Sequence, residues 1–128
     1  MNDCIIGIGS NIDAGYHIPQ ILELLADRFQ VVQVSAMVQT RAIGLTDQPD
    51  YTNGAVRIKT ELSMDELSVF LKQLEDRMGR DRSQPRFGPR NIDLDILIWN
   101  NKVVDPDYYT RDFLRHSAAE LGFTDKTT

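Results

Sequence analysis

Residues 90–98 read Arg90-Asn91-Ile92-Asp93-Leu94-Asp95-Ile96-Leu97-Ile98, a run in which apolar residues alternate with two aspartates. Alternation with a period of two is typical of a β-strand that buries one face. Asp93 and Asp95 are therefore expected on the same side of a strand, roughly 6–7 Å apart along the chain. Two carboxylates at this spacing could hold one or two hard cations such as Mg²⁺.

The same pattern would also fit an edge strand whose outer face is solvated. On a regular strand, however, Leu97 and Trp99 follow Asp95 on that face, which makes it half apolar. Carboxylates on such a face are unfavourable unless they meet cations. The sequence therefore favours a metal site, or a pairing with nearby arginines, over a solvated edge.

An arginine-rich segment lies immediately upstream of this strand. Between Gly79 and Arg90 there are four arginines against one aspartate in a chain whose net charge is −5. Arginine donates fork-like hydrogen bonds to phosphate oxygens and always carries its charge. A solvated loop is the alternative, but Pro85 and Pro89 restrict the segment, and Phe87 could stack on a ligand or anchor the loop. Carboxylates for a metal beside arginines for phosphates indicate chemistry on a nucleotide.

The composition limits the classes of protein that this chain could be. With 128 residues, 41% apolar and 26% charged, it is expected to form one domain over residues 1–128, with a polar tail at about 124–128. Its acidity gives no support for nucleic-acid binding. One cysteine excludes an internal disulfide, and no signal peptide or membrane-spanning stretch is recognisable, so a cytoplasmic protein without a membrane partner is expected.

The expected elements alternate between strands and helices. The sequence predicts strands at about 4–8, 30–38, 53–60 and 92–98, and helices over about 18–29, with Pro19 in the first turn, and 64–78. Ser63 and Glu66 form a capping box, and Gly79 suits a left-handed C-terminal cap. The order β-α-β-β-α-β predicts an α+β protein with a ferredoxin-like core: a four-stranded, mainly antiparallel sheet with two helices on one face. After Val104 the pattern weakens.

Two other segments could bind a heterocycle or a phosphate. Tyr51 offers a ring for stacking and Asn53 a donor and an acceptor for a heterocycle edge, although a polar turn with a packed tyrosine is the usual case. The run from Gly7 to Asn11 invites a dinucleotide-binding interpretation, which we reject because the third glycine of that motif would fall at Ile12. Glu75 is expected at a solvated helix position.

Several of these segments together resemble one enzyme family. They are Gly9-Ser10-Asn11, Asp47-Gln48-Pro49-Asp50-Tyr51 with Asn53, Gly79-Arg80, and Phe87-Gly88-Pro89-Arg90-Asn91-Ile92-Asp93-Leu94-Asp95. The chain resembles the 6-hydroxymethyl-7,8-dihydropterin pyrophosphokinases, the folate-pathway enzymes that move pyrophosphate from ATP onto a pterin alcohol and release AMP. The resemblance runs colinearly from about Ile5 to Val104. The family usually has a proline where this chain has Arg41, and a tryptophan where it has Phe87.

This resemblance implies the residues of the site. The catalytic residues would be Arg80, Arg90, Asp93 and Asp95, with Asp93 and Asp95 binding two Mg²⁺ ions. ATP, the co-substrate, would be bound by Glu75, Arg80, Arg82, Phe87, Arg90, Ile96 and Arg111. The pterin would be bound by Thr40, Ile43, Tyr51, Asn53, Asp93 and Phe113.

Two other hypotheses stay open at this point. The segment after Val104 is shorter than the family's, so the chain could be a non-catalytic homologue that binds a pterin or a nucleotide through a reduced ATP site. It could also be a plain ferredoxin-like interaction domain, which would leave the carboxylates and arginines unexplained. The partners implied by the resemblance are small-molecule substrates, and the protein is expected to be a monomer or a homodimer.

Overall fold

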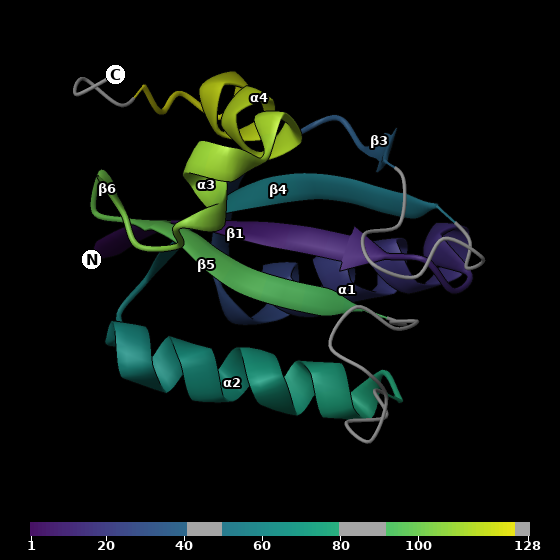
Figure 1. Cartoon of the computed structure of the whole chain (residues 1–128). Coiled ribbons are helices and arrows are strands. Elements are labelled where there is room, and N and C mark those ends of the chain that lie inside the picture. The colour runs from purple at the N-terminus through teal and green to yellow at the C-terminus, as the bar shows by residue number, and fades with distance from the viewer. Residues whose placement is uncertain (41–49, 80–91, 125–128) are drawn as a thin grey trace.

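The computed structural model describes residues 1–40, 50–79 and 92–124. In these residues an antiparallel sheet is covered by helices on both faces (Figure 1). The strands are β1 (Asn2–Ser10), β2 (Gln30–Val34), β3 (Val38–Thr40), β4 (Tyr51–Thr60), β5 (Asp93–Trp99) and β6 (Lys102–Val103). The helices are α1 (Ala14–Arg28), α2 (Met64–Arg77), α3 (Asp107–Thr110) and α4 (Asp112–Glu120).

The strands lie in the order β2-β4-β1-β5-β6, and β3 also pairs with β4. Every pairing is antiparallel, so the prediction of an α+β protein with an antiparallel sheet is confirmed. The prediction of four strands is wrong, because the described residues form a six-stranded sheet. The segment predicted as one strand over 30–38 divides into β2 and β3.

The sixth strand comes from a tight turn. Asn100 and Asn101 both have positive φ, 48° and 66°, and they join β5 to β6. A two-residue hairpin turn of type I′ needs positive φ at both central residues, and asparagine tolerates this conformation. The turn pairs Ile98 with Val103, which adds a short edge strand that the sequence pattern did not reveal.

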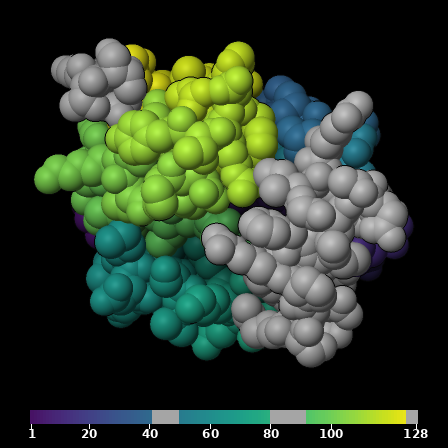
Figure 2. Space-filling view, viewed as in Figure 1, coloured from purple at the N-terminus to yellow at the C-terminus, as the bar shows by residue number. Residues whose placement is uncertain are grey.

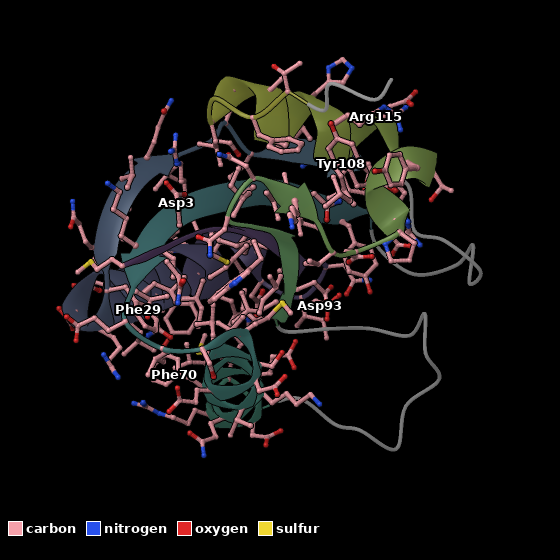
Figure 3. The ribbon with its side chains drawn as sticks, turned by 90° about the vertical axis from the view of Figure 1, so that its left-hand side faces the viewer. Asp3, Phe29, Phe70, Asp93, Tyr108 and Arg115 are labelled. Atoms are coloured by element: carbon pink, nitrogen blue, oxygen red, sulfur yellow. The ribbon has the colours of Figure 1, made fainter. Side chains whose placement is uncertain are left out.

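Two hydrophobic cores lie on opposite faces of the sheet. On one face, α1 and α2 pack against residues such as Ile6 and Ile8 of β1. Phe29 and Phe70 meet edge to face there, with ring centroids 5.2 Å apart (Figure 3). On the other face, the helices α3 and α4 cover Ile5, with Tyr108 buried among them. The prediction placed helices on one face only, because the segment after Val104 lacked a clear pattern.

A β-bulge on β5 reverses the alternation along this strand. The register between β1 and β5 slips at Leu97, which has no partner on β1. Up to Ile96 the apolar side chains face α1 and α2, but Leu97 and Ile98 both pack in the second core, and Trp99 returns to the first. The predicted faces of Ile98 and Trp99 are therefore wrong, because one extra residue switches every later side chain to the other face. The two aspartates precede the bulge and keep their common face.

The boundaries of α2 follow its predicted capping residues, whereas the start of α1 differs from the prediction. Ser63 Oγ accepts a hydrogen bond from the Glu66 amide at 3.2 Å, and Glu66 Oε1 accepts one from the Ser63 amide at 2.9 Å, so the predicted capping box is confirmed. Gly79 has a φ of 86°, as a left-handed cap requires. The predicted start of α1 is wrong, because the helix begins at Ala14 and Pro19 lies inside it.

Replacing Ser63 by alanine should destabilise the protein by about 1 kcal/mol, because the first turn of α2 loses the acceptor for one of its free N–H groups. Urea unfolding measures the effect. The matched control is Ser68→Ala in the same helix, which should be neutral or slightly stabilising because alanine has the higher helix propensity. Equal unfolding midpoints for the two variants would contradict the capping role.

Candidate functional site

Three neighbouring strands place residues from distant parts of the chain in one row. Gly9 of β1 pairs with Asn53 of β4 on one side and with Asp93 of β5 on the other. Residues directly opposite each other in antiparallel strands project from the same face. Because neighbouring strands lie about 4.8 Å apart, the outer two backbones of the row are separated by roughly 10 Å. The row therefore has a polar amide at one end, a carboxylate at the other, and no side chain between them.

The next row on this face repeats the arrangement. Gly7 pairs with Ala55 of β4 and with Asp95 of β5. Asp93 and Asp95 thus share one face, as predicted, and this face is the one that α3 and α4 cover in part (Figure 1). The space-filling view shows α3 and α4 forming a continuous surface next to the hairpin of β5 and β6 (Figure 2).

Three of the residues predicted to bind a pterin lie together at the amide end of the row. Thr40 of β3 pairs with Tyr51 of β4. The side-chain amide of Asn53 donates a hydrogen bond to Thr40 Oγ1 at 2.6 Å. Tyr51 projects from the same face as Asn53, since the two residues are two positions apart on one strand. The predicted Ile43 lies outside the described residues.

At the carboxylate end of the second row, Asp95 is surrounded by acidic groups. Burial of its carboxyl group, followed by the charges of Asp93, Asp105, Glu75 and Asp107, raises the pKa of Asp95 to about 7. The residue is nevertheless exposed, so burial contributes less than the charges do, and the repulsion from four carboxylates supports the direction of the shift. Binding of a cation among these carboxylates would relieve their repulsion and so stabilise the site.

The C-terminal helices bring further predicted residues to the same face. Arg111 forms an ion pair with Asp107, with Nε 3.7 Å from Oδ2. Asp105 Oδ1 accepts a hydrogen bond from the Asp107 amide at 2.9 Å, which fixes the start of α3. Phe113 is half-buried at the start of α4 and packs against the second core, on the same side of the sheet as Tyr51. Its role in binding the pterin stays a prediction.

Glu75 is not at a solvated helix position, and that expectation is wrong. The residue is 3% exposed, and its Oε2 accepts a hydrogen bond from the Leu94 amide at 2.8 Å. Leu94 lies between the two aspartates on β5, and β6 pairs only with the far end of that strand. Glu75 therefore accepts a hydrogen bond from an amide of β5 that pairs with no strand of the described residues, and it holds the carboxylate-bearing segment of β5 against α2.

The remaining predicted residues fall into two groups. Ile96 packs in the first core, on the face opposite to the two aspartates. Four others, all in the arginine-rich segment, lie outside the described residues: Arg80, Arg82, Phe87 and Arg90. No contact with ATP is tested for any of these residues, so their ATP-binding roles stay predictions.

The donor atoms on this face suit magnesium. In residues 1–40, 50–79 and 92–124, no group of three or more histidines, cysteines, aspartates or glutamates could hold a metal ion. Mg²⁺, however, is usually held by one or two carboxylates together with substrate phosphates and waters, rather than by an all-protein cage. Asp93 and Asp95 supply hard oxygen donors of this kind, so the residues present fit a magnesium site that is completed by a bound nucleotide.

Three residues of this face were not predicted from the sequence. Asp105 and Asp107 contribute to the field at Asp95, but they lie in a segment without a recognisable pattern. Gly9 was part of a recognised motif and had no role assigned to it. Its signal was present, because Gly7 and Gly9 alternate with Ile6 and Ile8 on a central strand, which leaves one face of that strand without side chains between positions 7 and 9.

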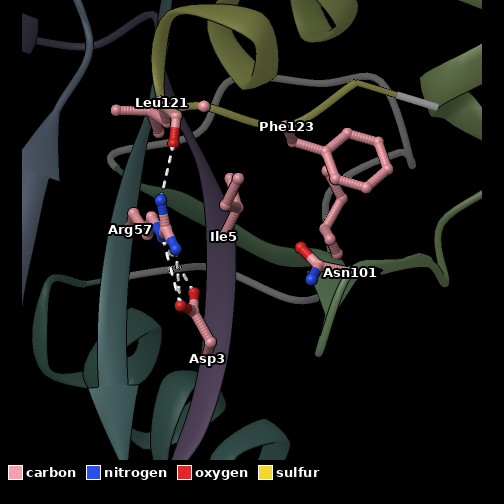
Figure 4. Close-up of a pocket in the computed structure, with 8 residues that line it drawn as sticks. Asp3, Ile5, Arg57, Asn101, Leu121 and Phe123 are labelled. Atoms are coloured by element: carbon pink, nitrogen blue, oxygen red, sulfur yellow. Dashed lines mark hydrogen bonds and ion pairs between the residues drawn. The ribbon is translucent and has the colours of Figure 1, made fainter.

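A small pocket at the other end of the same face has a structural explanation. Arg57 donates hydrogen bonds to both carboxylate oxygens of Asp3 and to the carbonyl oxygen of Leu121 (Figure 4). The hydrogen bond to Asp3 raises the pKa of Arg57. Phe123 and Ile5 line the same pocket. Arg57 thus links the end of α4 to the sheet.

None of the helices in the described ranges is long and apolar enough to cross a membrane.

Comparison with known proteins gives a consistent result. Residues 5–122 match the family model described as 7,8-dihydro-6-hydroxymethylpterin-pyrophosphokinase. The 2-amino-4-hydroxy-6-hydroxymethyldihydropteridine pyrophosphokinase of Bacillus subtilis is 36% identical over 131 residues, which cover 94% of this chain and 78% of that protein. The protein of the same name from Aquifex aeolicus is 31% identical over 91% of this chain and 78% of its own length. A folate synthesis bifunctional protein of Arabidopsis thaliana is 35% identical over 82% of this chain and 22% of its own length.

Proposed function

The chain belongs to the 7,8-dihydro-6-hydroxymethylpterin-pyrophosphokinase family, and we propose that it transfers pyrophosphate from ATP to the hydroxymethyl group of 6-hydroxymethyl-7,8-dihydropterin, releasing AMP. Family membership confirms the predicted enzyme class, an ATP-dependent pyrophosphokinase of folate biosynthesis. The observation that carries the proposal is the row Asn53–Gly9–Asp93, which brings a residue predicted to bind the heterocycle close to one predicted to bind the metal.

The geometry of the row fits the substrates. A pterin whose ring edge meets Asn53 and whose ring stacks on Tyr51 would extend along the row toward Asp93, a span of roughly 10 Å between the outer strands. Its hydroxymethyl oxygen would then lie beside the carboxylates. That oxygen loses its proton and forms a bond to the β-phosphorus of ATP, the bond from this phosphorus to the oxygen it shares with the α-phosphorus breaks, and AMP leaves with that oxygen.

The proposed role of the carboxylates is to hold metal ions, which neutralise charge and position the substrate. Asp93 and Asp95 would hold the Mg²⁺ ions, which when bound neutralise phosphate oxygens and align them for in-line displacement. Glu75 keeps both aspartates in position through the amide of Leu94. Arg111, already beside Asp107, would provide positive charge near the nucleotide. Phosphoryl transfer depends mainly on such positioning and electrostatic stabilisation.

The proposed activity can be tested by measuring the reaction products. The protein, incubated with ATP, Mg²⁺ and 6-hydroxymethyl-7,8-dihydropterin, should form AMP and the pterin pyrophosphate in equal amounts and no ADP. Folded protein that forms no AMP above background would contradict the proposed activity. Calorimetry then distinguishes the active enzyme from the non-catalytic homologue. Pterin binding without turnover would identify the non-catalytic homologue, and binding of neither ligand would exclude both hypotheses.

The strand order also bears on the predicted fold. The order β2-β4-β1-β5 supports a ferredoxin-like core to which β3 and β6 are added. The single-domain extent over residues 1–128, the monomeric or homodimeric state and the cytoplasmic location stay predictions.

A further inference from the structure

We propose that Gly9 is required for tight binding of the pterin, because its missing side chain leaves the space over β1 in which the ring would lie and allows Asn53 to keep its orientation. The inference rests on the proposed function and deepens it. Gly9 is the central residue of the row, with Asn53 on one neighbouring strand and Asp93 on the other.

A side chain at position 9 would enter the recognition site itself. A Cβ added to Gly9 would lie 2.8 Å from Asn53 Oδ1 and 3.7 Å from Tyr51 Cδ1. The first distance is shorter than a carbon–oxygen contact allows, so Asn53 would have to move. Even one methyl group would therefore disturb the amide that is expected to bind the ring edge, besides occupying the floor beneath the ring.

Asn53 has little freedom to accommodate such a change. Its amide nitrogen donates to Thr40 Oγ1 at 2.6 Å, and Thr40 is fixed by the pairing of β3 with β4. Moving the amide would stretch or break this hydrogen bond. A displaced Asn53 would then present its donor and acceptor to the ring in the wrong place.

The backbone of β1 is also held at the end of the strand, one residue after Gly9. Ser10 is fully buried, and its hydroxyl donates to the carbonyl oxygen of Ile12 at 3.1 Å. His17 Nδ1 lies 2.6 Å from the same oxygen, and its ring N–H can donate to it. Asn11 is 5% exposed. A turn packed in this way resists the backbone shift that would otherwise relieve a clash at position 9.

Other glycines of the described strands have a different environment. A Cβ on Gly7 would meet the side chain of Leu97 at 3.3 Å, and one on Gly54 would meet Met37 Sδ at 2.3 Å. Both neighbours are apolar packing groups. Only at Gly9, among these strand glycines, do the nearest side chains belong to residues predicted to bind the pterin.

The substitution Gly9→Ala tests the proposal by calorimetry and kinetics on the full chain. We expect the Kd and KM for 6-hydroxymethyl-7,8-dihydropterin to rise on the order of tenfold or more, which corresponds to about 1.4 kcal/mol per factor of ten. The Kd for ATP and the kcat at saturating pterin should change little. The matched control is Gly15→Ala in α1, where an added Cβ has no atom within 4 Å, and it should leave pterin binding unchanged.

A double-mutant cycle with Asn53→Ala separates this mechanism from a general loss of structure. Without the Asn53 amide only the methyl group beneath the ring remains as a cost, so Gly9→Ala should cost less pterin affinity in the Asn53→Ala background than in the wild type. If Gly9→Ala alone does not fold, the double variant should fold.

Three results would overturn the inference. They are wild-type pterin affinity in a folded Gly9→Ala, full additivity of the two substitutions, and a double variant that is unfolded like the single one. A wild-type protein that neither binds the pterin nor forms AMP would instead overturn the proposed function, and the inference with it.

Discussion

Replacing Asp95 by asparagine should lower the rate of AMP formation by about 10³-fold or more, because the variant loses one of the two carboxylates that we propose to hold the metal. A bound metal ion contributes several kcal/mol of transition-state stabilisation to this type of chemistry, and about 4 kcal/mol corresponds to this factor. The side chain keeps its size, and the fold should be intact. The rate is measured with saturating ATP, Mg²⁺ and pterin.

The same substitution should stabilise the ligand-free protein at alkaline pH. Burial and the neighbouring carboxylates raise the pKa of Asp95 from 3.8 to about 7, so the folded state binds this proton more tightly than the unfolded state does. Stability therefore falls as the pH rises from 3.8 to about 7, and the loss is complete above that range. The variant, which has no charge at this position, should avoid that loss.

Thermal unfolding in EDTA at pH 8 and at pH 5 measures this effect. Asp95→Asn should have the higher Tm at pH 8, and the difference should shrink at pH 5. Mg²⁺ with ATP should raise the Tm of the wild type more than that of the variant. The control Asp27→Asn, on an exposed position of α1, should change neither the rate nor the pH dependence. An unchanged rate in Asp95→Asn would remove its metal-binding role.

Replacing Glu75 by leucine should have the second large effect. The leucine side chain cannot accept the hydrogen bond from the Leu94 amide, and a buried N–H without a partner costs about 1–3 kcal/mol. The segment of β5 between the aspartates should also shift, and misplacement of catalytic groups by about 1 Å can lower kcat by on the order of 100-fold. Urea unfolding and steady-state kinetics measure the two effects.

Glu75→Gln is the informative partner of that variant. Glutamine has the same shape and keeps an oxygen acceptor for the Leu94 amide, so most of the stability and of kcat should return. A rise in the KM for ATP in this variant, with little change in kcat, would support the ATP-binding role predicted from the sequence. Equal losses in the leucine and glutamine variants would contradict the role of the hydrogen bond to Leu94.

Local features of the fold could be predicted from the sequence because neighbouring residues determine them. The capping box of Ser63 and Glu66 and the left-handed cap at Gly79 depend only on residues within one turn of helix. The common face of Asp93 and Asp95 likewise follows from the period of a strand. In each case the interacting groups lie within a few residues of one another.

Features that depend on pairing between distant segments could not be predicted. The bulge at Leu97 arises from the register of β5 against β1, and no residue within β5 marks it. Gly9 acquires its significance only because the register places it between Asn53 and Asp93. Glu75 was expected to be solvated because helix periodicity cannot show that the Leu94 amide of β5 lies close enough to donate a hydrogen bond to it. The site is therefore a product of strand register, while its residue types could be recognised in the sequence.

A crystal structure of the protein with 6-hydroxymethyl-7,8-dihydropterin, Mn²⁺ and an ATP analogue that cannot be cleaved between the α- and β-phosphates would test the site most directly. The anomalous signal of manganese should lie between Asp93 and Asp95, with the pterin ring over Gly9 and its edge at Asn53. Manganese bound elsewhere, or a pterin bound away from this row of three strands while the ligands are fully occupied, would contradict the account.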